Sequence, residues 1–219
     1  MQTLDLSGES KKSDGRLKSL FWPTVENAWD VDYLGQQGFW ICVVIGILNF
    51  AMSASMSFGF PVLAVRIVLF FVGVLALFVY WVGGMGVREH SFAAALTVFV
   101  IYVVGVLAQV RFPGVIPIII GAVLLSNVRA TFLASQWRPA SEDEDRPMRF
   151  NDTLRDKLVD QIPPRAWPVL RYPFYIASSL LLVLMIFGAF VNLANRRAQS
   201  IRNENSVPSA VVVASPDFH

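Results

Sequence analysis

The chain has 219 residues, of which 55% are hydrophobic and only 16% are charged. Soluble globular domains contain about 45–50% apolar and about 25% charged residues, so this chain is too apolar for an ordinary soluble fold. The net charge is only +2, and the basic residues form no stripe beside exposed aromatics, which argues against nucleic-acid binding. The single cysteine, Cys42, excludes an intrachain disulfide and a cysteine-based zinc site. Its apolar surroundings predict a small buried side chain.

The first 37 residues are mixed in polarity and contain four basic residues, Lys11, Lys12, Arg16 and Lys18. A signal peptide places its apolar core within the first 15–30 residues, so we expect no cleaved signal here. The first apolar run begins only near Gly38, and we predict that it remains in the membrane as a helix.

Five segments approach the length of about 20 apolar residues that a membrane-spanning helix requires. They are residues 39–58, 67–87, 91–110, 114–128 and 174–194. The fourth is short, because Arg129 interrupts it. The runs lack the alternation of barrel strands and are longer than the roughly ten-residue strands of a membrane barrel.

The predicted fold class is therefore all-α: an integral membrane bundle of four to five transmembrane helices plus an amphipathic surface helix. We divide the chain into a cytoplasmic N-terminal segment with interfacial aromatics, a four-helix membrane region, a cytoplasmic loop, a fifth transmembrane helix and a flexible tail. Their ranges are 1–37, 38–135, 136–173, 174–195 and 196–219.

The distribution of lysine and arginine predicts the orientation. With the N-terminus inside and five spans, most of the 18 basic residues fall on the cytoplasmic side. We therefore expect a multi-pass protein of the bacterial inner membrane with a cytoplasmic N-terminus and a periplasmic C-terminus. Arg196 and Arg197, directly after the last span, argue against this orientation, and a re-entrant span would reverse the C-terminus.

The large loop contains the amphipathic pattern. Apolar residues recur every four positions among charged ones, as expected for one face of a helix; they are Phe150, Leu154, Leu158 and Ile162. Pro163 and Pro164 end the pattern. Such a helix lies on the membrane surface, on a partner protein or on the loops of its own chain, and the sequence does not choose among the three.

A catalytic set is missing from the sequence. There is no metalloprotease, phosphate-loop or dinucleotide motif. The five predicted spans contain no Asp, Glu or Lys, although proton-coupled transporters usually need an ionisable relay in the membrane. Gly83, Gly84 and Gly86 are better explained by a close helix contact or a flexible helix end than by phosphate binding. We predict that the protein is not an enzyme.

Three polar residues near the inner end of the fourth span, Asn127, Arg129 and Thr131, form a possible functional cluster. A charge inside the membrane often marks a functional site. The simpler explanation is that Arg129 reaches the lipid headgroups.

Residues 88–90 predict a solvated turn between two spans. His90 is also a possible ligand for a chlorophyll magnesium or a haem iron. The sequence requires no cofactor, whereas lipid contacts are expected.

Two stretches resemble a class of small bacterial membrane proteins of unassigned function. Residues 87–91 (VREHS), followed by Ala93–Ala95 and a span with Tyr102, resemble the polar turn that opens one span in that class. Residues 127–132 (NVRATF) resemble its motif at the close of the next, and residues 21–28 resemble its amphipathic segment before the first span. The resemblance covers about residues 20–135 and implies a compact helical bundle, but no activity.

These observations favour a non-catalytic accessory or scaffold subunit of a larger membrane complex, with a photosynthetic or respiratory complex as its natural host. Its partners would be other membrane subunits and lipids. One alternative is a small homo-oligomeric transporter or channel-like protein with Asn127 and Arg129 on its path. Another is a membrane-anchored regulator that binds a partner through residues 149–162.

Overall fold

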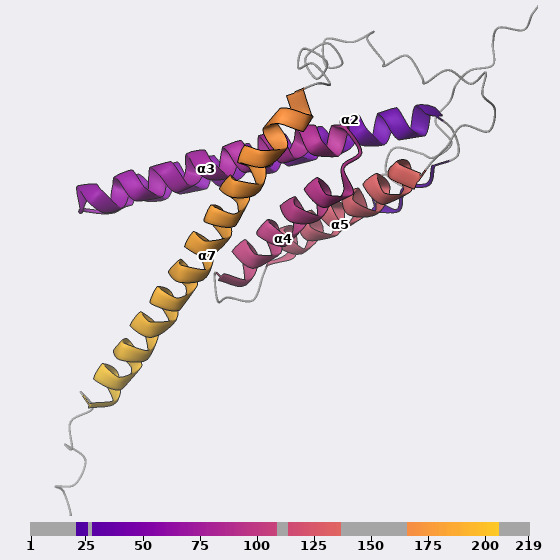
Figure 1. The fold of residues 1–219 in the computed structure, drawn as a ribbon. Coiled ribbons are helices and arrows are strands. Elements are labelled where there is room, and N and C mark those ends of the chain that lie inside the picture. Colours follow the sequence, from indigo (N-terminus) through magenta and orange to yellow (C-terminus); the bar gives the residue numbers. More distant parts are fainter. Residues whose placement is uncertain (1–20, 26–27, 109–113, 137–165, 206–219) are drawn as a thin grey trace, which may run out of the picture.

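The computed structural model describes residues 21–25, 28–108, 114–136 and 166–205 (Figure 1). These residues form five α-helices, and no β-strand occurs among them. Four of the helices are long and apolar enough to cross a membrane, and the fifth is shorter. The predicted all-α membrane fold is thus confirmed. The predicted surface helix with Phe150, Leu154, Leu158 and Ile162 lies outside the described residues.

The first two helices form a long antiparallel hairpin. Helix α2 (Ala28–Gly59) and helix α3 (Leu63–Arg88) are separated by only three residues, including Pro61. Close approach depends on small residues: a Cβ atom on Gly84 would lie 3.2 Å from the carbonyl oxygen of Phe39. The prediction of a close helix contact at the glycines of α3 is therefore confirmed.

A second hairpin packs against the first. It comprises helix α4 (Phe92–Ala108) and helix α5 (Val115–Gln136), linked by a hydrogen bond of 2.9 Å from the Tyr102 hydroxyl to the carbonyl oxygen of Pro117. Because α2 and α4 start at the same end of the bundle, α3 and α5 also finish there (Figure 1). This end gathers the polar residues discussed below.

Helix α7 (Ala166–Asn205) packs against α3 and α4 and extends well beyond them (Figure 1). Phe174 and Leu181 of its first half are fully buried in the core, which also contains Cys42, Val79 and Ile101. The complete burial of Cys42 confirms the small buried side chain predicted for it. The second half of α7 leaves the bundle, and most of its side chains are exposed.

Several helices extend beyond the predicted spans. Helix α2 begins at Ala28, within the predicted N-terminal segment, so Asp30 and Asp32 belong to the same helix as the first span. The fourth span is not short, because α5 continues through Arg129 to Gln136. The predicted flexible tail is helical up to Asn205. Arginine, alanine and glutamine, which dominate residues 195–200, are good helix formers, so the helix continues where hydropathy falls.

Candidate functional site

A buried ion pair ties the start of α2 to the end of α3. The Nη1 atom of Arg88 lies 2.8 Å from Oδ1 of Asp32 and also donates a hydrogen bond of 2.8 Å to the Asp32 carbonyl oxygen. The two side chains are only 6% and 9% exposed. The prediction that residues 88–90 form a solvated turn is therefore wrong for Arg88. A charge so far from water is tolerated when its partner is this close.

His90 lies next to this ion pair and has an unusual backbone. Its φ angle of 57° places it in the left-handed region, which non-glycine residues enter rarely. The Nε2 atom lies 3.1 Å from the carbonyl oxygen of Val31, and because a carbonyl only accepts, Nε2 is the protonated nitrogen in this contact. The nitrogen that most often ligates iron or magnesium is thus directed at the main chain of α2.

Burial lowers the pKa of His90 from its ordinary value of 6.5, because an apolar environment disfavours the charged ring. The positive charge of Arg88 acts in the same direction, whereas the Val31 carbonyl, Glu89 and Asp32 oppose it. His90 is therefore neutral at physiological pH and acts as a hydrogen-bond donor to α2.

Two glycines of α2 make this polar end possible. A Cβ atom at Gly35 would lie 3.1 Å from Nε2 of His90, and one at Gly38 would overlap the side chains of Val87 and Asn127. Helix α2 thus approaches α3 and α5 at the same level of the bundle. Asn127, which Gly38 contacts, is one of the three residues predicted to form a polar cluster.

The structure separates that predicted cluster into two parts. Asn127 and Thr131 face the bundle interior, where the Thr131 hydroxyl donates a 2.8 Å hydrogen bond to the Asn127 carbonyl oxygen. Both are buried, and the Asn127 amide nitrogen lies 4.0 Å from Sγ of Cys42. Arg129 points elsewhere, since residues two positions apart on a helix face different directions. Its guanidinium carbon lies 3.7 Å from the centre of the Trp22 ring.

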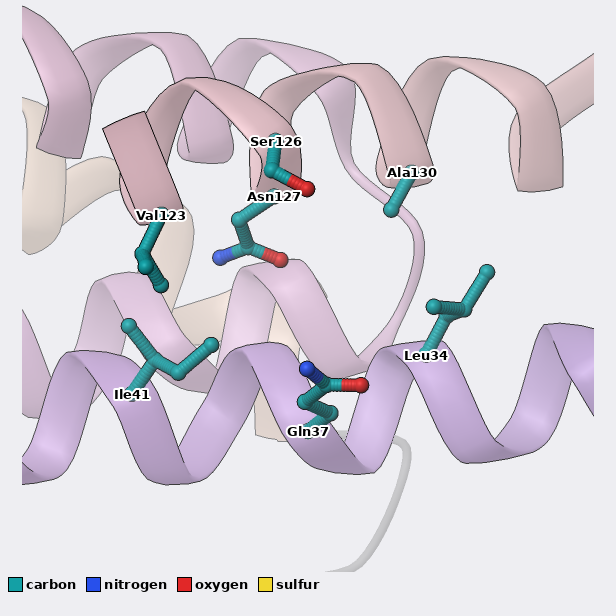
Figure 2. A pocket seen from close by; sticks show the side chains of 7 residues that line it. All are labelled: Leu34, Gln37, Ile41, Val123, Ser126, Asn127 and Ala130. Carbon is teal, nitrogen blue, oxygen red and sulfur yellow. The ribbon is translucent and has the colours of Figure 1, made fainter. Parts of the chain in front are cut away.

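A small cavity lies between α2 and α5 beside Asn127. Figure 2 shows the amide groups of Gln37 and Asn127 directed toward each other across it, with Ser126 adjacent. The Oε1 atom of Gln37 is buried and has no hydrogen-bond partner in the structure. The cavity measures about 10 Å³, close to the space that one water molecule needs. These dimensions and polar groups suit a single bridging water.

A much larger groove lies on the other side of α5. Trp22 and Arg129 line it together with Phe92 and Phe132, whose rings meet edge to face with centroids 5.6 Å apart. The groove has a volume of about 670 Å³ and is lined mainly by apolar groups. The guanidinium of Arg129 therefore places a positive charge beside an apolar groove.

Asp32 was not among the predicted site residues, and Arg88 is buried where a solvated turn was predicted. A local signal was present: Asp32 closely precedes a long apolar run, and Arg88 directly follows another. In an antiparallel hairpin these two positions meet, so opposite charges at the outer ends of adjacent spans predict an ion pair.

Comparison with known proteins gives no relative. No family model, curated protein or solved structure matches this chain. The resemblance of residues 20–135 to small bacterial membrane proteins therefore stays a prediction. Within the described ranges, no three metal-ligating side chains of the His, Cys, Asp or Glu type come together.

Proposed function

We propose that this chain is a non-catalytic accessory subunit that helps to scaffold a larger membrane complex. The observation that carries the proposal is how little of its own apolar surface the chain covers. In the most apolar stretches of α2, α3 and α7 only 22% of the residues are buried, and in α5 the share is 33%. The remaining apolar side chains are available to lipid and to the helices of other subunits.

The second half of α7 is the surface we assign to a neighbouring subunit. Large apolar side chains are exposed there, among them Phe187 at 65% and Phe190 at 66%. Figure 1 shows this half running away from the other helices. Helices in lipid associate through close van der Waals packing. An apolar helix that packs against its own chain at one end only has most of its length free for such packing.

The polar end of the bundle supports a structural role. Arg88 is paired with Asp32, His90 contacts a main-chain carbonyl oxygen and Thr131 bonds within its own helix. Arg88 and His90 are thus engaged in holding α2 to the end of α3 and the turn after it, and Thr131 in a contact within α5. An acid–base catalyst, in contrast, needs a titrating group within reach of a substrate.

The location belongs to the same proposal. We place the protein in a bacterial inner membrane with its N-terminus in the cytoplasm, because lysine and arginine are concentrated before the first span and in the loop before Arg171. An energy-transducing complex, photosynthetic or respiratory, is the host we favour, because such complexes contain non-catalytic membrane subunits.

The first test is extraction of the native membrane with a mild detergent, followed by native-gel mass spectrometry and an absorption spectrum of the same band. We expect a heteromeric band in which this chain is present at fixed stoichiometry, and pigment or haem absorption would identify the host. A colourless homomeric band would contradict the proposal and favour the transport alternative.

A second test locates the contact. A photo-crosslinking amino acid is placed at Phe187 in α7 and, as a control of similar exposure, at Ile118 in α5. We expect an adduct with another polypeptide from position 187 and mainly lipid adducts from position 118. Adducts with a second copy of the chain would instead support a homo-oligomer, and lipid adducts alone at both positions would contradict a subunit contact through α7.

A further inference from the structure

The groove beside Arg129 combines a cation with an apolar wall. It lies between the segment containing Trp22, the first residue of α4 and the outer face of α5, and has a volume of about 670 Å³. Phe92 and Phe132 form part of its wall, and Leu125 extends the apolar lining along α5. A depression of this size accommodates parts of lipid acyl chains.

Arg129 supplies a positive charge whose hydrogen-bonding capacity is not used up. Its Nη1 atom is buried, and within the part of the chain that the structure describes it has no hydrogen-bond acceptor. The contact of the guanidinium with the Trp22 ring orients the group but neutralises no charge. A shielded guanidinium of this kind is stabilised by an anion that accepts several N–H bonds.

The position of Arg129 near the end of α5 suits contact with a headgroup phosphate. Arg129 lies about two turns before α5 ends at Gln136, which is roughly 10 Å along the helix axis. The buried ion pair of Asp32 and Arg88 lies at the same end of the bundle. Trp22 completes the environment, because tryptophan favours the boundary between headgroups and hydrocarbon.

We infer that this groove binds one anionic phospholipid, with the phosphate on the Arg129 guanidinium and an acyl chain along the wall formed by Leu125, Phe92 and Phe132. Charge complementarity selects the occupant: an arginine fork binds two phosphate oxygens at once. The apolar wall binds the chain of the same molecule. A soluble phosphate satisfies only the first of these two requirements.

The test uses the purified full chain and native mass spectrometry of lipid retention in mild detergent. Phosphatidylglycerol is compared with phosphatidylcholine of identical chains. We expect the wild type to retain one phosphatidylglycerol selectively, and Arg129→Gln to weaken this binding by roughly tenfold or more, as for the loss of hydrogen bonds to a charged group. The Arg129→Lys variant keeps the positive charge but not the paired donors of the guanidinium. Its affinity for phosphatidylglycerol should lie between those of the wild type and of Arg129→Gln.

Arg171→Gln is the matched control. Arg171 is an exposed arginine whose guanidinium carbon lies 4.8 Å from the centre of the Tyr172 ring. Its replacement removes the same charge without changing the groove. Equal loss in both variants would show general electrostatic attraction and overturn the site. Equal retention of the two lipids by the wild type would overturn it even if Arg129→Gln fails to fold. Displacement of the lipid by millimolar inorganic phosphate alone would also overturn it, because a free anion would then be the ligand.

Discussion

Replacing Arg88 with methionine should destabilise the protein more than any replacement of an exposed arginine. One nitrogen of Arg88 serves both the carboxylate and the carbonyl oxygen of Asp32, each at 2.8 Å. The Arg88→Met variant therefore leaves a carboxylate that is 9% exposed without its cation. Removing one member of a buried pair costs about 3–5 kcal/mol, and we expect a loss of this size in the free energy of unfolding.

The double variant Asp32→Leu/Arg88→Met separates the charge effect from the packing effect. With both charges removed, the desolvation penalty disappears as well, so the double variant should regain most of the loss. The assay is reversible unfolding in mixed micelles with increasing sodium dodecyl sulfate, followed by circular dichroism. Arg66→Met is the control, because Arg66 is exposed at the other end of α3, and it should change the free energy by about 0.5 kcal/mol or less.

Two outcomes would refute this reasoning. If Arg88→Met lowers the free energy of unfolding by no more than Arg66→Met does, the ion pair contributes nothing to the stability of the bundle. If the double variant loses the sum of the two single losses, the two side chains act independently, and the coupling expected of a buried pair is absent.

Three further predictions use the same assay or a reporter. The Gly38→Val variant should lose about 1–3 kcal/mol of the free energy of unfolding, because the new side chain would overlap Asn127. Gly59→Ala is the control and should leave this free energy unchanged, because the space around Gly59 is open. Equal effects of the two changes would contradict the close approach of α2 and α5 at Gly38. The lowered pKa of His90 means that the unfolded chain binds the proton more tightly, so stability should fall as the pH drops below about 6.5. The His90→Gln variant should lose this slope, and an unchanged slope would assign it to other groups. Alkaline phosphatase fused to the C-terminus should be active and a fluorescent protein at the same place dark; the reverse result would place the C-terminus in the cytoplasm.

Hydropathy predicted the membrane helices because the bilayer imposes one length on every span. Hydropathy did not predict the helix ends, since it does not separate a helix that stops from one that continues beyond its apolar stretch, as α7 does after Ala194. The local glycine pattern of α3 predicted close packing correctly. The prediction succeeded because residues without a side chain allow the backbones of two helices to approach closely.

The candidate site was less accessible to sequence reasoning. Asp32 and Arg88 are distant in the chain, and hydropathy does not indicate that α2 begins as early as Ala28 and so includes Asp32. Asn127, Arg129 and Thr131 were grouped because they are close in sequence, but helical geometry turns Arg129 to a different side. Trp22, which contacts Arg129, lies more than 100 positions away, and no periodicity connects them.

The length of α7 determines how far its C-terminal end lies from its apolar stretch. Its 40 residues measure about 60 Å, roughly twice the thickness of the hydrocarbon layer. Residues 195–205 alone carry the helix about 16 Å beyond its apolar stretch, which exceeds the depth of one headgroup layer. The helix thus acts as a spacer, because it carries Asn205 well beyond the apolar stretch that suits the hydrocarbon layer.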